Sequence, residues 1–493
     1  YERIDGIIEE MAALKGQLAN SPENVQKYYQ LSDEGGMLSY KVYCYVALQG
    51  DLDLADNEMQ AKRQEVSALF ARWGQATSWF TPELLEIPYD EMKGWLDKNL
   101  DLALYRFAID EVYRQQEYVL DESGEHLLSL QSMFNGSPRD IYQMLTTADV
   151  EWPTITLSTG EEVTVSGGQY YARLQTERAR EDREAVWRAF FETYEKNINT
   201  YASIYNAIAQ RDWGQAQSRG YETTLHAALD GNAIPTQVVE TLIDVTKKGA
   251  GPLQRYYDLR KRALGLEAHA IYDGYVSLVP DDQEYGYGEA REAVVASVAP
   301  LGSDYQDKLR HGLDNNWVDV YETQGKRSGA YSMGVYGVHP FVLLNYTDTM
   351  NDVFTLAHEM GHAMHSVMSM ENQPFVYSDY TIFVAEVAST LNEGLLLDHL
   401  LEQTDDPAVR VGLLQHAIDQ IALTYYRQVA FADFELQAHR IAEAGQPITA
   451  DVLNDLYYGI LEDYYGDVTD LDELYGITWA RIPHFYNSPY YVY

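Results

Sequence analysis

The sequence predicts a mainly α-helical protein, and two observations carry that prediction. Apolar side chains recur at the three- and four-residue spacing of a buried helix face through long stretches, as at Phe190, Tyr194 and Tyr201. Only two short stretches, near residues 151–168 and 338–346, have the alternating or β-branched composition of strands. We therefore expect a large helical body that carries little sheet.

Helix starts are marked at several points along the chain. Thr81 and Ser137 are each followed by proline, a combination that suits an N-cap residue and the first helical position. Val239, Leu242 and Val245 continue the helical spacing after another proline. These signals predict helices that begin near residues 81, 137 and 236.

The two extended stretches differ in character. Residues 151–168 contain two short β-prone runs on either side of Gly160, which predicts a small hairpin. Residues 338–346 are apolar and include Pro340, which lacks an N–H and favours the edge of a sheet. An edge strand can bind an extended peptide by strand addition, and an ordinary core strand is the alternative.

No fixed-period repeat, low-complexity tract or proline-rich linker divides the chain. We expect an N-terminal helical region at residues 1–190, which includes the hairpin, and a catalytic domain at residues 191–493. The 493 residues are 46% hydrophobic and 13% aromatic, which is enough for a large core.

Charge excludes several classes of partner. The chain has 76 acidic and 35 basic residues, a net charge of −41, so its field repels nucleic acid and anionic membranes. The acidity fits either a solvated, soluble surface or adaptation to high salt. Cys44 is the single cysteine, and no apolar run is long enough to span a bilayer. We expect a cytoplasmic protein without a nucleic-acid or membrane partner.

Residues 358–362 read His-Glu-Met-Gly-His, the H-E-x-x-H pattern. On a helix, His358 and His362 share a face and can both reach one Zn²⁺ ion. Glu359 lies beside them and can take a proton from water. Asn351 and Asp352 are N-cap candidates for this helix. A helix with two ordinary histidines is the alternative reading.

A catalytic zinc site needs a third protein ligand. His365 lies about 10 Å along the axis from His358, too far for the same ion, so we expect it to pack beside the site. Glu386 and Glu393 lie downstream on a second helical stretch with an apolar stripe. An unpaired carboxylate there would be unfavourable. Spacing alone does not choose between Glu386 and Glu393.

Several segments together resemble oligoendopeptidase F, a family of zinc metallopeptidases in the thimet oligopeptidase group. They are residues 325–331, 343–346, 352–353, 358–365 and 385–393. The resemblance implies a helical metallopeptidase whose two halves flank a deep substrate channel. It also implies one Zn²⁺ per chain, held by His358, His362 and Glu386, with Glu359 as general base.

The last motif, residues 481–493, is rich in groups that can donate a hydrogen bond to an oxyanion. A chain with 41 tyrosines will also cluster some of them by chance. The resemblance favours His484 and Tyr493 as the groups that face the scissile carbonyl, with Tyr486 and Tyr490 next. Family members continue past this motif, so we expect a further C-terminal segment, cleaved, omitted or separate.

The resemblance implies an endopeptidase that hydrolyses internal bonds of short, unstructured oligopeptides. Two alternatives stay open. A helical zinc carboxypeptidase or dipeptidase shares the metal-binding pattern, and it needs a cationic anchor for the substrate carboxylate. A catalytically incomplete fragment would bind peptides without cleaving them.

Overall fold

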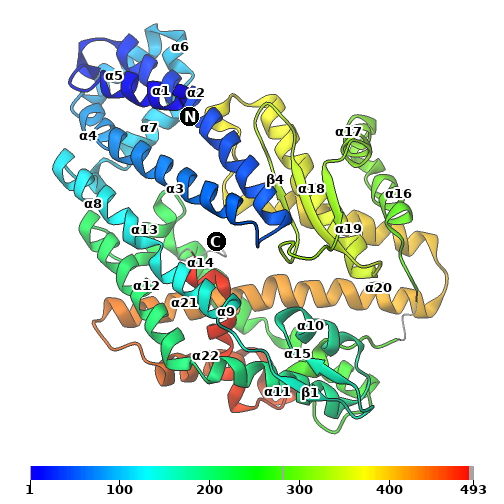
Figure 1. Ribbon diagram of the computed structural model, residues 1–493. Coiled ribbons are helices and arrows are strands. Elements are labelled where there is room, and N and C mark those ends of the chain that lie inside the picture. The colour runs from blue at the N-terminus through cyan, green and yellow to red at the C-terminus, as the bar shows by residue number, and fades with distance from the viewer. Residues whose placement is uncertain (1, 280–282, 488–493) are drawn as a thin grey trace. The chain divides into compact units, whose positions relative to one another are not determined.

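The computed structural model describes residues 2–279 and 283–487, and its backbone is mainly α-helical, as the sequence predicts (Figure 1). The chain forms two compact units. One contains Tyr1–Met133 with Gln283–Gln403, and the other contains Phe134–Asp282 with Thr404–Tyr493. Each unit is therefore built from two separate stretches of sequence. The sequence predicts an N-terminal region at residues 1–190 and a catalytic domain at residues 191–493. That assignment of catalysis stays a prediction.

The first unit holds one group of helices from the N-terminal stretch and another around the H-E-x-x-H motif. Its helices are α1 (Glu2–Ala12), α2 (Pro22–Leu52), α3 (Asn57–Thr77), α4 (Phe80–Leu85), α5 (Tyr89–Lys98), α6 (Leu100–Ala103), α7 (Arg106–Arg114), most of α8 (Glu122–Asn135), α16 (Tyr287–Ser297), α17 (Ser303–Asp314), α18 (Met350–Asn372) and α19 (Ile382–Gln403).

A three-stranded sheet in the first unit packs against α18. Its strands are β3 (Val318–Tyr321), β4 (Tyr331–Met333) and β5 (Phe341–Tyr346), in the order β3-β5-β4. β5 is parallel to β3 and antiparallel to β4. The predicted edge strand at residues 338–346 is therefore wrong, because this segment forms the central strand. Pro340 precedes the strand, so its missing N–H removes no bond from the ladder.

The second unit contains a further set of helices and a hairpin. Its elements are α9 (Ser137–Thr147), β1 (Thr154–Thr156), β2 (Glu162–Thr164), α10 (Gly167–Thr176), α11 (Arg180–Glu195), α12 (Ile198–Arg219), α13 (Thr224–Asp230), α14 (Thr236–Lys248), α15 (Gly251–Ala263), α20 (Pro407–Gln420), α21 (Arg427–Glu443) and α22 (Ala450–Tyr465). A π-helical segment, Ile421–Tyr426, joins α20 to α21.

The local predictions are confirmed with small shifts. β1 and β2 form the predicted antiparallel hairpin, and a helix begins at Thr236. The N-cap residues near the two marked prolines are Trp79 and Gly136, one or two residues earlier than predicted. The long helical stretch around Tyr194 is divided between α11 and α12. Helix ends are set by caps and packing as well as by local sequence.

Aromatic side chains dominate the core of the second unit. Trp187, Tyr205, Phe434 and Trp479 are fully buried there, with ring centroids 5.6–6.2 Å apart between Tyr205 and its two neighbours Phe434 and Trp479. The first unit buries a separate cluster between α1, α2 and the short helices that follow. Each unit thus has its own core, as expected of a compact folding unit.

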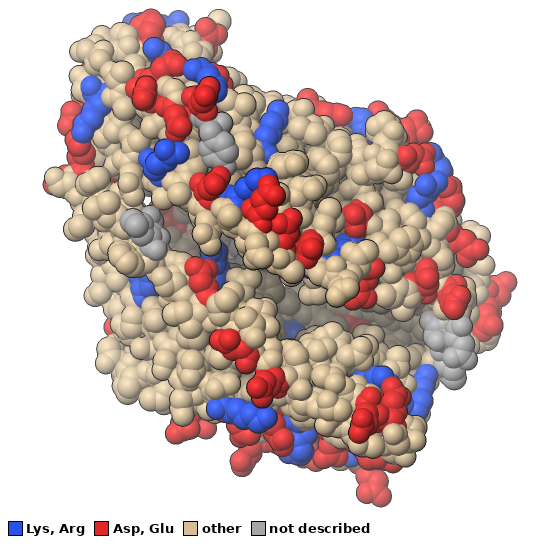
Figure 2. Space-filling view, viewed as in Figure 1, with Lys and Arg blue, Asp and Glu red and all other residues tan. Residues whose placement is uncertain are grey.

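The surface reflects the composition. Acidic side chains are spread over the visible face, with basic side chains among them (Figure 2). In the described residues, no helix combines the length and apolar character that crossing a bilayer requires.

Candidate metal centre

The start of α18 is fixed by a capping box. Thr349 is the N-cap, and its hydroxyl accepts a hydrogen bond from the backbone N–H of Asp352. The Asp352 carboxylate in turn accepts from the N–H and hydroxyl of both Thr347 and Thr349, at 2.8–3.0 Å. The predicted N-cap residues Asn351 and Asp352 therefore lie inside the helix. Asp352 still secures the start, because it is the third residue of the box.

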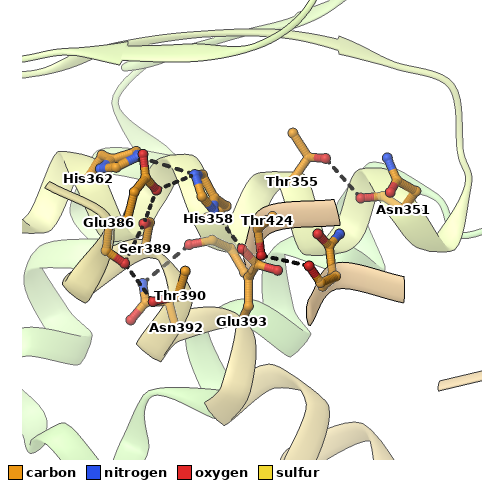
Figure 3. Close-up of polar contacts among 12 residues, drawn as sticks. Asn351, Thr355, His358, His362, Glu386, Ser389, Thr390, Asn392, Glu393 and Thr424 are labelled. Carbon is orange, nitrogen blue, oxygen red and sulfur yellow. Dashed lines mark hydrogen bonds and ion pairs between the residues drawn. The ribbon is translucent and has the colours of Figure 1, made fainter. Parts of the chain in front are cut away.

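α18 presents both motif histidines on one face, opposite Glu386 of α19 (Figure 3). Nε2 of His358 and Nε2 of His362 lie 3.2 Å apart. Oε2 of Glu386 lies 3.2 Å from the first nitrogen and 3.4 Å from the second. Two imidazole nitrogens and one carboxylate oxygen thus converge on a single point.

The spacing of these three atoms fits a tetrahedral ion. Zinc–ligand bonds of about 2.0–2.1 Å at tetrahedral angles separate neighbouring ligand atoms by about 3.3–3.4 Å. The observed separations of 3.2–3.4 Å match that value. Two imidazoles and a carboxylate are also a donor set that divalent transition metals accept. The three side chains therefore fit a metal ion without rearrangement.

A glycine lets the two helices approach closely enough for this arrangement. A Cβ atom on Gly361 would lie 2.6 Å from Cα of Ser389 and 2.8 Å from the carbonyl oxygen of Ala388. Ser389 is fully buried at this crossing, and its hydroxyl donates to Oε2 of Glu386 at 2.8 Å. Gly361 and Ser389 thus set both the spacing of the helices and the direction of the Glu386 carboxylate.

Glu393 occupies the other side of His358. Its Oε1 lies 2.5 Å from Nδ1 of the ring, while Nε2 faces Glu386. A carboxylate on the outer nitrogen fixes the orientation of a metal-binding imidazole and increases its basicity. Of the two glutamates that the sequence left as alternatives, Glu386 completes the three-residue group and Glu393 supports His358 from behind.

The charges of this cluster are strongly coupled. Burial lowers the pKa of His358, but its hydrogen bonds to Glu386 and Glu393 outweigh that effect and raise the pKa to about 10. Hydrogen bonds from His358 and His362 hold the pKa of Glu386 far below its usual range. The cluster therefore retains protons that a bound cation would displace.

Glu359 is buried next to the two histidines, with 7% of its surface exposed. Burial raises the pKa of its carboxyl, and the nearby charges of His358 and His362 oppose that shift. A carboxyl whose pKa is raised towards neutrality is better suited to accept and return a proton.

His365 lies away from the group that could hold a metal, as the sequence predicts. Its ring stacks on Tyr380 at a centroid distance of 3.6 Å. The apolar stripe of α19 is largely exposed. Phe383, Val387 and Leu391 are at least half exposed, and the Glu386 side chain is 65% exposed. Glu386 is therefore held by its histidine and serine contacts and not by an apolar environment.

A cleft of about 880 Å³ lies in the same unit. Strand β4 contributes Tyr331, Ser332 and Met333 to its wall, and α18 contributes Ser366. β4 pairs with β5 on one side, and within the described residues no strand pairs with its other side. The free edge of this sheet next to the cleft therefore belongs to β4.

His484 and Tyr486 are the C-terminal candidates that the structure describes, and both belong to the second unit. His484 is partly buried on a 3₁₀ helix, Pro483–Tyr486, and burial lowers the pKa of its imidazole. Tyr486 is fully buried and stacks on Tyr142 with centroids 3.8 Å apart, as expected of a core residue. Tyr490 and Tyr493 lie outside the described residues. The choice of an oxyanion donor stays a prediction.

The sequence reasoning missed Gly361, Ser389 and the supporting role of Glu393. A serine three residues after Glu386, on the same helix face, was the available signal for Ser389. The glycine inside the motif signalled a close approach of another backbone. Neither signal identifies its partner without the fold.

Known proteins are similar to this chain over nearly all of its length. The chain is 36% identical to oligopeptidase PepF of Bacillus subtilis, over all of this chain and 73% of that protein. It is 33% identical to group B oligopeptidase PepB of Streptococcus agalactiae, over 99% of this chain and 80% of that protein. The crystal structure of oligoendopeptidase-F from Enterococcus faecium matches with a TM-score of 0.78 and 30% identity, over the whole chain and 83% of that structure.

Two family descriptions match the sequence. Residues 83–152 match the family described as oligopeptidase F, and residues 173–493 match peptidase family M3. These matches, together with relatives that align over the whole of this chain, show that the chain belongs to peptidase family M3 and is a peptidase of the oligoendopeptidase F type.

Proposed function

We propose that this protein is a zinc-dependent endopeptidase that hydrolyses internal bonds of short, unstructured oligopeptides. The observation that supports it most is the convergence of His358, His362 and Glu386 at tetrahedral spacing, with Glu359 buried beside them. When bound, zinc would lower the pKa of water and polarise the scissile carbonyl.

The side chains of α18 and α19 would divide the remaining work. Glu359 would accept a proton from the attacking water and later return it to the leaving amine. Glu393 would hold His358 in the required tautomer, and Ser389 would orient Glu386. His484 and Tyr493 are proposed to donate hydrogen bonds to the oxyanion, on the strength of the family resemblance alone.

We infer that an extended peptide binds along β4. The backbone groups on its free edge are available for strand addition, which recognises main-chain atoms and tolerates varied side chains. The adjoining cleft offers aromatic and small polar side chains, among them Tyr40, Trp73 and Ser332. This assigns to β4 the role that the sequence suggested for residues 338–346.

Product mapping by mass spectrometry tests the proposal. The zinc-loaded protein and its Glu359→Gln variant are each incubated with unstructured peptides, some of them amidated at the C-terminus. Glu371→Gln is the matched control, because Glu371 lies on the exposed part of the same helix and pairs with Lys308. We expect internal cleavage by the wild type and the control, and a rate lower by about 10²–10⁴-fold in Glu359→Gln.

The other outcomes separate the alternatives. Release of C-terminal residues from free peptides only, with amidated peptides intact, would indicate a carboxypeptidase. Zinc and peptide binding without any product would indicate a binding protein. Unchanged cleavage by Glu359→Gln would contradict the role of Glu359 as general base.

A further inference from the structure

The second unit contains a small cavity lined by arginine and tyrosine side chains. Its volume is about 30 Å³, above the roughly 10–15 Å³ of cavity volume that a bound water needs. The lining includes Tyr170 of α10, Arg427 of α21, Tyr464 of α22, Thr478 and Arg481 of the helix Glu473–Arg481, and Tyr275. α21 and α22 can be followed in Figure 1. The cavity lies within the aromatic core of this unit.

Two of the lining residues carry positive charge without a carboxylate partner. Arg427 donates a hydrogen bond to the hydroxyl of Tyr275 at 2.8 Å, and Arg481 donates to the hydroxyl of Tyr171 at 2.8 Å. The Arg481 guanidinium also lies over the rings of Tyr170 and Phe191. Among the residues that the structure describes, neither arginine forms an ion pair.

Other arginines within the same unit are paired with acids. Arg183 and Arg180 both bind Asp273, at 2.6 and 3.1 Å, and Arg211 binds Asp212 at 2.8 Å. The chain has 76 acidic residues for 35 basic ones, so counter-charges are plentiful. Arg427 and Arg481 are partly buried. Two such arginines that face one cavity, with no acid beside them among the described residues, give this cavity a net positive charge.

Unused hydrogen-bond donors also face this region. Tyr464 is 2% exposed and lines the cavity, and its hydroxyl has no partner among the residues that the structure describes. Nε of Arg481 is likewise buried without a partner. Buried polar groups are seldom left unpaired, because each unmade hydrogen bond is destabilising. These groups are donors, so an acceptor in the cavity would satisfy them.

The charges of Arg427 and Arg481 shift the pKa of the neighbouring Tyr171 side chain. Burial raises the pKa of the Tyr171 hydroxyl, yet the guanidinium groups of Arg481 and Arg427 outweigh burial and lower the net pKa. Tyr171 is 37% exposed, so its lowered pKa indicates a positive potential beside the two arginines and not inside the core.

A change of helix type places Arg427 at the cavity. The π-helical segment Ile421–Tyr426 ends immediately before Arg427, and its residues Ala422 and Tyr426 also line the cavity. A π-helical turn inserts an extra residue per turn and is frequent at functional sites. The π-helical turn therefore brings Ala422, Tyr426 and Arg427 together at the wall of the cavity.

We propose that this cavity binds one small monovalent anion between Arg427 and Arg481, either a chloride ion or a carboxylate group. The anion accepts from the two guanidinium groups and from the Tyr464 hydroxyl, and it supplies the missing negative charge. Guanidinium groups suit this task because they remain charged and present several donors. This binding site does not depend on the proposed peptidase chemistry.

Chloride-35 NMR line widths test the proposal on the full chain. Ionic strength is kept constant with sodium gluconate, whose anion is too large for the cavity. We expect excess broadening by the wild type, and affinity weaker by about 10–100-fold in Arg481→Gln, which loses charge-assisted hydrogen bonds. Tyr464→Phe is the second variant, in case Arg481→Gln does not fold. It removes only one hydroxyl, so it should keep the fold and weaken anion binding. Arg440→Gln, an exposed arginine of α21 paired with Glu240, is the matched control.

A second measurement needs no variant. Crystals of the wild type soaked in sodium bromide should give an anomalous peak in contact with both guanidinium groups. Acetate then distinguishes the two anions. Displacement of bound halide by millimolar acetate would show that the cavity takes a carboxylate group, and resistance to acetate would show that it is a halide site.

Three results would overturn the proposal. One is equal broadening by the wild type, Tyr464→Phe and Arg481→Gln. Another is a bromide map with no peak in the cavity, which would leave water as its occupant. The third is absorbance at 295 nm near pH 8 that disappears in Tyr171→Phe, because a phenolate would then supply the negative charge instead of an anion.

Discussion

Nδ1 of His358 donates a hydrogen bond to Oε1 of Glu393 across 2.5 Å, while Nε2 of the same ring faces Glu386. One glutamate of α19 therefore orients the imidazole from behind, and another approaches the point where a metal ligand is needed. This relationship explains why the two glutamates have different tasks although both lie on the same helix.

Glu393→Gln should weaken zinc binding by about 10–100-fold, because the amide keeps the shape of the side chain but removes the charge that supports His358. A competition titration with a zinc-chelating dye measures this. Glu402→Gln, an exposed glutamate of the same helix, should bind zinc like the wild type. Equal affinity in both variants would show that Glu393 does not support the site.

Gly361→Ala should destabilise the first unit by about 1–3 kcal/mol and weaken zinc binding, because the new methyl group would collide with the backbone of Ser389 and Ala388. The matched control is Gly394→Ala on α19, where a Cβ meets nothing within 4 Å. That substitution should be neutral or stabilise by up to about 1 kcal/mol, through helix propensity. Urea unfolding and the dye titration give the two readouts, and a Gly361→Ala variant with wild-type values would refute the close approach.

Asp352→Ala should lower stability by about 2 kcal/mol, because one carboxylate oxygen accepts four hydrogen bonds at the start of α18. Asn351→Ala should change it by less than about 0.5 kcal/mol, since that side chain is exposed and caps nothing. Denaturation midpoints compare the two. A larger loss of stability in Asn351→Ala than in Asp352→Ala would indicate that Asn351 is the residue that caps the helix.

His269 should make folding depend on pH in the acidic range. Its ring is fully buried, with Nδ1 3.1 Å from the Thr469 hydroxyl, and burial lowers the pKa to about 4. The unfolded state, with a pKa near 6.5, takes up the proton first as the pH falls, so stability decreases below about pH 6.5. Between pH 7 and pH 5 this residue alone should remove about 2 kcal/mol.

The His269→Asn variant tests whether this residue lowers the stability of the protein as the pH falls. Its free energy of unfolding should fall by about 2 kcal/mol less than that of the wild type between pH 7 and pH 5. His126→Asn changes an exposed histidine and should keep the wild-type pH profile. A His269→Asn profile parallel to that of the wild type would show that the ring is not held neutral.

How much could be predicted depends on the range of the interactions. Helical spacing, proline positions and the hairpin turn at Gly160 are local, and they gave the helical class and the hairpin correctly. The place of residues 341–346 in the sheet was missed, because strand order depends on β3 and β4, which lie elsewhere in the sequence. The exposure of the apolar stripe of α19 could not be predicted, because periodicity shows that a face is apolar and not what covers it.

The sequence by itself determined the chemistry of the centre, because i and i+4 on a helix bring His358 and His362 to one face whatever surrounds them. It could not rank Glu386 against Glu393 without the family resemblance, since both positions are far from the motif along the chain. Only the tertiary structure brings Glu386, and not Glu393, beside both histidines, through the close approach of Gly361 and Ser389 that sets the spacing of α18 and α19. The same holds for Arg427 and Arg481, which are 54 positions apart in the printed numbering and face one cavity only because the helices of the second unit pack around it.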